Sequence, residues 1–111
     1  ADILLAMSQE ACNKYISLLK KGGKLIVDTT LVEDIPSVEA EVLPIGITKA
    51  ARSELGNPMF ANIIALGALV GSTGIVSHES LTQAVLKRVP KGTEGINQQA
   101  LELGFRMGKK D

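Results

Sequence analysis

The chain has 111 residues, of which 45% are hydrophobic, and its 12 basic residues balance 12 acidic ones. The length suits one domain spanning 1–111, and the composition is that of a globular protein and not of a disordered one. The balanced charge and the scarcity of aromatic residues argue against a nucleic-acid or membrane-surface partner.

The first residues predict a βαβ unit. Residues 2–7 form a short, continuous apolar run that is typical of a strand covered on both faces. Ser8 is expected to cap a helix, and residues 24–30 predict a second buried strand. Two strands separated by one helix should be parallel, with a right-handed crossover.

The helix between these strands is expected to run to a Gly-Gly pair. Four apolar residues recur at helical spacing and predict its inward stripe: Cys12, Tyr15, Ile16 and Leu19. Gly22 and Gly23 then predict its left-handed exit.

A third strand is predicted at 41–47, after an acidic loop at 31–41. Pro44 has no N–H to donate to a ladder, so this strand should lie at an edge of the sheet or end nearby.

The second half of the chain predicts helices. Thr48 is expected to open a short helix that ends at Leu55-Gly56, and Asn57 with Pro58 opens a helix that runs to about Thr73 with Gly74 as its exit. Ser77 caps a segment at 78–89, with Leu81, Val85 and Val89 inward. Thr93 opens the last helix, whose predicted inward stripe is Ile96, Ala100, Leu103 and Met107. The fold class is therefore α/β, a parallel βαβ Rossmann-like sheet followed by a helical C-terminal half.

The predicted helix at 58–73 lies in an interval without charged residues, between Glu54 and Glu79. Its longest run without a polar side chain is 63–71, far short of the roughly 20 residues of a membrane span, so we expect no membrane segment. Its sides are apolar almost all round, which favours burial partly by another subunit. The interface candidates are Asn62, which equally could bond to a neighbouring loop, and the G-x-x-x-G pair Gly67 and Gly71.

Polar residues follow the first two predicted strands, where parallel α/β sheets bind their ligands. These weak candidates for cofactor binding are Ser8, Gln9, Asp28, Thr29 and Thr30. The alternative is local: Ser8 as a helix cap and Asp28 as a partner for loop amides.

No catalytic residue is predicted, because no nucleotide-binding glycine motif or defensible carboxylate pair occurs. His78 is expected at the surface and Cys12 in the core. One cysteine excludes an internal disulfide and any cysteine-based metal cluster held by this chain alone. A lone buried thiol and the absence of a signal-peptide pattern predict a cytoplasmic protein, and a start within a strand suggests a piece of a longer chain.

Three stretches resemble the gamma subunit of 2-oxoacid:ferredoxin oxidoreductases. They are ADILLAMSQEACNKYISLLKKGGKLIVDTTLV (1–32), LGNPMFANIIALGALVGSTGIVSHESL (55–81) and KGTEGINQQALELGF (91–105). Together they cover most of the chain in the family's order, and the first is closest to the 2-oxoglutarate-type enzymes. Pyruvate, branched-chain 2-oxoacid and indolepyruvate enzymes carry related domains.

The resemblance implies a complex that converts a 2-oxoacid, with 2-oxoglutarate favoured and pyruvate next, and coenzyme A to acyl-CoA and CO2. Ferredoxin would receive the electrons. Thiamine diphosphate would lie between the alpha and beta subunits, and iron–sulfur clusters in the beta and delta subunits, so this chain would bind no cofactor alone. Gamma subunits of the family begin with a G-x-G-G-Q-G loop, which is absent from 1–111, so no phosphate contact of that loop is carried over.

Two alternatives stay open. The passage LLKKGGKLIVDTT (18–30) resembles the helix–Gly-Gly–strand passage of Rossmann-type methyltransferases, although three helices follow here where those enzymes have an antiparallel strand pair. The chain could instead be an oligomerisation module that uses the apolar helix as a dimer seam.

Overall fold

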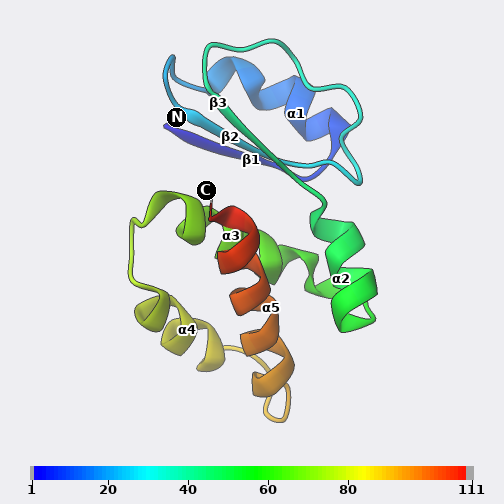
Figure 1. Cartoon of the computed structure of the whole chain (residues 1–111), viewed down its shortest axis with the longest axis vertical. Helices are drawn as coiled ribbons and strands as arrows, with labels where there is room; N and C mark the ends of the chain where they lie inside the picture. Colours follow the sequence, from blue (N-terminus) through cyan, green and yellow to red (C-terminus); the bar gives the residue numbers. More distant parts are fainter. Residues whose placement is uncertain (1, 110–111) are drawn as a thin grey trace. The chain divides into compact units, whose positions relative to one another are not determined.

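A computed structural model describes residues 2–109, which form two compact units divided between Gly46 and Ile47. The first holds a sheet and the second holds helices (Figure 1). This agrees with the predicted α/β class, a parallel sheet followed by a helical half. The single domain over 1–111 stays a prediction.

The sheet unit has three parallel strands in the order β1-β2-β3: β1 (Ile3–Ala6), β2 (Lys24–Asp28) and β3 (Glu41–Ile45). Leu4 pairs with Leu25, and Leu25 pairs with Val42. The parallel pairing of β1 and β2 around a helix confirms the βαβ prediction. β3 lies at an edge, as the proline in it required.

The helix of this unit is shorter than expected. α1 (Gln9–Tyr15) passes into a 3₁₀ turn, η1 (Ile16–Leu18), and Leu19 is already extended. A 3₁₀ turn has three residues per turn, so it breaks the 3.6-residue stripe. Tyr15 is 41% exposed, and its place in the inward stripe was a wrong prediction.

The prediction that the Gly-Gly pair is the exit of α1 was therefore wrong. The pair forms a turn that leads into β2. The backbone N–H of Gly23 donates to the carbonyl of Lys20 at 2.8 Å, and Gly22 has a φ of +81°. A Cβ at Gly23 would lie 2.6 Å from the carbonyl oxygen of Asp2. Backbone crowding at this turn explains the glycine.

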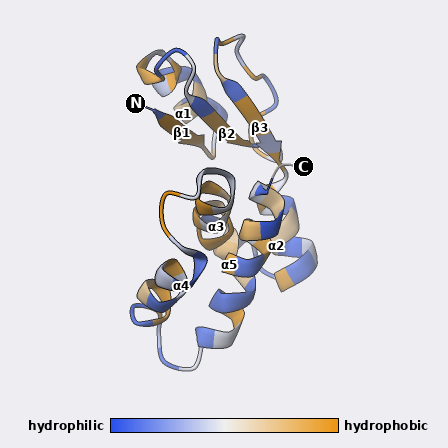
Figure 2. Ribbon diagram, turned by 60° about the vertical axis from the view of Figure 1, so that its left-hand side comes forward, coloured by the Kyte–Doolittle hydropathy of each residue, from blue (hydrophilic) through white to orange (hydrophobic). Residues whose placement is uncertain are grey.

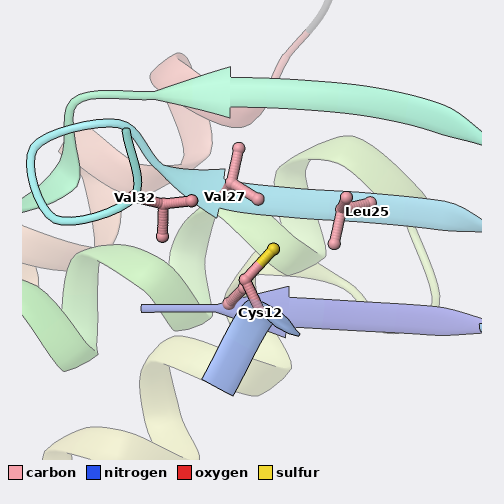
Figure 3. Packing of buried hydrophobic residues seen from close by; sticks show 5 residues of the cluster. Cys12, Leu25, Val27 and Val32 are labelled. Carbon is pink, nitrogen blue, oxygen red and sulfur yellow. The ribbon is translucent and has the colours of Figure 1, made fainter. Parts of the chain in front are cut away.

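The core of the sheet unit is made by side chains from α1, β2 and the following loop. Cys12, Leu25, Val27 and Val32 are buried together with Ala6. Figure 3 shows the Cys12 sulfur pointing toward β2, which carries Leu25 and Val27. The prediction that Cys12 is a core residue is confirmed.

The helical unit contains α2 (Ile47–Leu55), the 3₁₀ turn η2 (Pro58–Phe60), α3 (Ala61–Thr73), α4 (His78–Leu86) and α5 (Glu94–Gly108). The predicted helix ends at Asn57, Ser77 and Gly74 are confirmed by their caps. The predicted opening at Thr48 is wrong, because α2 already begins at Ile47 and Thr48 is buried inside it. The segment predicted at 78–89 is helical only to Leu86. Asn57 accepts from the Met59 N–H at 2.9 Å, and Ser77 accepts from the Ser80 N–H at 3.0 Å. Gly74 ends α3 with a φ of +66°, a conformation that glycine adopts at no steric cost.

Glycines bring α3 and α5 into backbone contact. A Cβ at Gly67 would lie 2.5 Å from the carbonyl oxygen of Leu101, and one at Gly71 would lie 2.6 Å from that of Phe105. Cβ atoms at Gly104 and Gly108 would clash in turn with backbone carbonyls of α3. Figure 2 shows that the two helices differ in polarity, since α3 is mainly hydrophobic and α5 carries much hydrophilic surface.

The buried face of α5 is turned by about one residue from the predicted stripe. Ala100 is buried as expected, but Ile96, Leu103 and Met107 are only half-buried. The residues that are buried are Asn97, Ala100, Leu101, Gly104, Phe105 and Gly108. The reason is steric, because Gly104 and Gly108 must face α3 for the helices to approach.

α4 covers another part of this core. Leu81 and Val85 pack against a cluster of Val70, Leu101 and Phe105, so their predicted inward placement is confirmed. Across residues 2–109, none of the helices has the length and apolarity that crossing a membrane would require.

Candidate functional site

The strand-end site comprises Ser8, Gln9, Asp28, Thr29 and Thr30. Ser8 and Gln9 follow β1, and the other three residues lie at or just after the end of β2. Ala6, the last residue of β1, pairs in register with Val27, which directly precedes Asp28 at the end of β2. The structure therefore brings both groups to the carboxyl edge of the sheet, where the sequence placed them.

Ser8 acts as a helix cap. Its Oγ accepts a hydrogen bond from the Ala11 N–H at 3.1 Å, which satisfies one of the free amides of the first turn of α1. α1 has only seven residues. The capping alternative weighed for Ser8 is therefore the one that the structure shows.

Gln9 holds the loop after β2. Its Oε1 accepts from the backbone N–H groups of Glu33 at 3.0 Å and Asp34 at 2.8 Å, and its Nε2 donates to the carbonyl of Asp34 at 2.7 Å. Nε2 also donates to the Oδ1 of Asn13 at 3.1 Å. One side-chain amide thus serves both a donor and an acceptor of the loop, a role that sequence reasoning missed because no local pattern links residues so far apart.

Asp28 is fully buried at the end of β2. Its Oδ1 accepts from the Thr30 N–H at 3.0 Å, and its carbonyl accepts from the Val32 N–H at 2.8 Å. Thr29 is exposed, and its N–H donates to the Ile45 carbonyl at 2.9 Å, which joins β2 to the end of β3. The local alternative for Asp28 is therefore realised.

These contacts define what the strand-end site can do chemically. The polar groups of Ser8, Gln9 and Asp28 shape the backbone of the loop at 29–34, and they form no nucleophile–base pair. No group of three or more His, Cys, Asp or Glu residues within 2–109 could hold a metal ion. Every buried side-chain nitrogen or oxygen in that range has a hydrogen-bond partner, so the buried carboxylate of Asp28 is a satisfied group at this polar edge.

Cys12 packs in the core with Ala6 and Val27, residues near this edge. Burial, with a smaller contribution from the Asp34 carboxylate, raises the pKa of its thiol. The reactive thiolate is therefore disfavoured, and Cys12 behaves as a small apolar residue of the core.

The interface candidates of the helical unit have separate environments. Asn62 is exposed near the start of α3. Gly67 and Gly71 contact α5 of the same chain, so their close-packing property is used within the unit. The matching glycines of α5, Gly104 and Gly108, were missed, although the run GFRMG repeats the G-x-x-x-G spacing of α3.

His78 is exposed, as expected, at the first position of α4. Its imidazole stacks on the Phe105 ring of α5, with centroids 3.9 Å apart and planes 9° from parallel.

The chain is similar to known proteins over nearly its whole length. The family described as pyruvate ferredoxin/flavodoxin oxidoreductase matches residues 1–107. The chain is 42% identical to 2-oxoglutarate synthase subunit KorC of Methanocaldococcus jannaschii, over 98% of this chain and 59% of that protein.

Solved structures agree with this match. The gamma subunit of a keto/oxoacid ferredoxin oxidoreductase from Geobacter sulfurreducens superimposes with a TM-score of 0.94 at 42% identity, over 97% of this chain and 64% of that one. A 2-oxoglutarate:ferredoxin oxidoreductase from Magnetococcus marinus, solved with 2-oxoglutarate, coenzyme A and succinyl-CoA, gives 0.76 at 22% identity, over 96% of this chain and 19% of that one. At that identity the second likeness shows the fold alone. The chain spans less than two thirds of the length of the Methanocaldococcus KorC subunit and of the Geobacter gamma subunit.

Proposed function

Because this chain belongs to the pyruvate ferredoxin/flavodoxin oxidoreductase family, we propose that it is part of the gamma subunit of a 2-oxoacid:ferredoxin oxidoreductase. The observation that carries the proposal is the 42% identity, over nearly the whole chain, to both an archaeal KorC subunit and a bacterial gamma subunit. Identity at this level over nearly the whole chain supports common descent in addition to a common fold. The methyltransferase alternative has no comparable support.

The proposed reaction joins a 2-oxoacid to coenzyme A. The bond between the keto carbon and the carboxylate breaks and CO2 leaves, while the thiol of coenzyme A releases its proton and forms a thioester to the keto carbon. Two electrons are released and reduce two molecules of oxidised ferredoxin. The favoured 2-oxoacid is 2-oxoglutarate, since the archaeal relative is named a 2-oxoglutarate synthase subunit. Pyruvate is the next candidate.

This chain would be non-catalytic by itself. Its single cysteine cannot supply the thiolates of an iron–sulfur cluster, and that cysteine is buried with a raised pKa. At the strand-end site, the side chains of Ser8, Gln9 and Asp28 make local hydrogen bonds, which supports a structural role for them. We therefore assign thiamine diphosphate and the clusters to the alpha, beta and delta subunits of the same cytoplasmic complex, and to this chain a role in assembly and in shaping the site for coenzyme A.

The test is purification of the full-length protein from its host through an affinity tag. The proposal expects recovery of subunits that bind thiamine diphosphate and iron–sulfur clusters, and coenzyme A-dependent reduction of ferredoxin by 2-oxoglutarate. Pyruvate and indolepyruvate, assayed in parallel, rank the substrates. A tagged protein that brings down none of these subunits would refute the proposal and return attention to a self-associating module.

A further inference from the structure

A hollow of about 410 Å³ lies beside α4 and α5 in the helical unit, and the functions assigned so far do not use it. It is lined by His78, Glu102, Phe105, Arg106 and Lys109. Phe105 is only 9% exposed, whereas the other four lining residues are exposed. The stacked rings of His78 and Phe105 join the two helices at this point. The α4–α5 hollow is thus a recess with an aromatic wall and charged side chains around it.

The charges of the α4–α5 hollow are unbalanced. Arg106 and Lys109 carry two positive charges against the one negative charge of Glu102, which accepts a hydrogen bond from Gln98 at 3.4 Å. No ion pair joins Arg106 or Lys109 to another residue within 2–109. A guanidinium binds a carboxylate through two parallel hydrogen bonds, and an ammonium nearby adds a third donor. The hollow therefore favours a carboxylate as its occupant.

Exposed apolar residues lie next to the hollow along the chain. Ile75 is 62% exposed and Val76 is 46% exposed, and they directly precede Ser77 and His78 at the start of α4. Exposed aliphatic side chains, together with the aromatic and the arginine of the hollow, resemble the composition of a protein interface. A small free anion would use the cations but would leave Ile75 and Val76 in water.

Resting on the proposed function, we propose that the α4–α5 hollow docks a segment of a partner subunit that presents an Asp or Glu carboxylate. The carboxylate binds Arg106 and Lys109, and apolar side chains that flank it cover Ile75 and Val76. The occupant is a protein segment and not a free anion, because the exposed aliphatic residues Ile75 and Val76 come just before His78, which lines the hollow.

The first test reverses the charge of the hollow in the full-length complex. Arg106→Glu/Lys109→Glu is compared with Lys87→Glu/Arg88→Glu, which makes the same charge change at exposed residues following α4 that do not line the hollow. The hollow variant is expected to bind its partner subunits about tenfold or more weakly, with the control within about twofold of wild type. Thermal melts by circular dichroism check folding, and Arg106→Gln/Lys109→Gln replaces a reversal that fails to fold.

The second test identifies the occupant by chemistry. A carbodiimide joins a carboxylate to a lysine amine only where the two are in contact, and mass spectrometry of the wild-type complex locates the link. An amide between Lys109 and an Asp or Glu of another subunit supports the proposal. A link from Lys109 only to its own full-length chain overturns it, as does a hollow variant that assembles as tightly as the control.

The two proposals fail differently. If the wild-type protein brings down no thiamine diphosphate or iron–sulfur subunit, the proposed function has failed. If the wild-type complex forms and the hollow variant forms it equally well, only the docking site is wrong.

Discussion

The sheet unit and the helical unit are packed by opposite means. In the sheet unit, large side chains such as Leu25 and Val27 fill the space between β2 and α1. In the helical unit, α3 and α5 approach until glycine backbones touch the facing helix. The first core is sensitive to atoms that are removed, and the second is sensitive to atoms that are added.

The largest effect is expected for Leu25→Ala in the sheet unit. Leu25 is fully buried, so truncation loses its transfer free energy and leaves a cavity, with a cost of about 3 kcal/mol. Urea denaturation of the full chain measures the free energy of unfolding. Leu31→Ala, at a leucine that is 47% exposed, is the control and should change it by less than about 0.5 kcal/mol. Equal losses for the two variants would contradict a side-chain core in this unit.

In the helical unit, a substitution that adds an atom is expected to be destabilising. Gly104→Ala adds one carbon that would clash with the Ile64 carbonyl and lie 2.9 Å from the Ala68 nitrogen, so we expect a loss of about 2 kcal/mol. Gly95→Ala is the matched control on the same helix, since a Cβ there meets nothing within 4 Å. It should stabilise the protein by about 0.5–1 kcal/mol, because alanine has the higher helix propensity. Equal signs for the two variants, measured by urea denaturation, would rule out backbone contact as the cause.

A smaller loss of stability is expected at Gln9, a single polar side chain that holds the loop after β2. Gln9→Ala removes the amide that bonds the loop at 33–34 and should cost about 1 kcal/mol. Amide hydrogen exchange at Glu33 and Asp34 should rise at the same time. Asn13→Ala, which loses only a contact to Gln9, serves as the control. Unchanged exchange at both amides in Gln9→Ala would show that the loop is held by other contacts.

The smallest effect concerns the pH dependence of the sheet unit. Burial raises the pKa of the Cys12 thiol in the folded state, so the neutral thiol is favoured there. Its contribution to stability is complete below the pKa of an unfolded thiol, about 8.5, and is lost as pH rises through the raised folded pKa. The free energy of unfolding should therefore fall more steeply above pH ~8.5 than in Cys12→Ala.

Thiol labelling checks the same feature directly. A disulfide reagent at pH ~8 should react slowly with the native chain and rapidly in urea, because only the exposed thiolate attacks. Native labelling as fast as in urea would contradict the buried position of Cys12.

Local signals predicted most of the fold. The apolar runs gave β1 and β2, and Ser8, Asn57, Ser77 and Gly74 marked helix ends because caps act within a few residues of where they occur. The errors arose where geometry depends on distant residues. α1 ended early in a 3₁₀ turn, and the α5 face turned because its glycines must meet α3.

The candidate site shows the same limit. The parallel βαβ pattern was enough to place Ser8 and Asp28 at one edge of the sheet. It could not show that Gln9 bonds to residues 33–34, since that contact joins positions 24 and 25 residues apart. Nor did any motif mark the α4–α5 hollow, because its aromatic wall joins His78 of α4 to Phe105 of α5.

The contact between α3 and α5 has an evolutionary consequence. A core of large side chains can drift, because a larger residue at one position is offset by a smaller one at its neighbour. Where backbone touches backbone, the facing partner has no side chain to shorten, so no second substitution restores the fit. Positions 67, 71, 104 and 108 should therefore stay glycine in descendants of this chain, while Leu25 and Val27 exchange with other aliphatic residues.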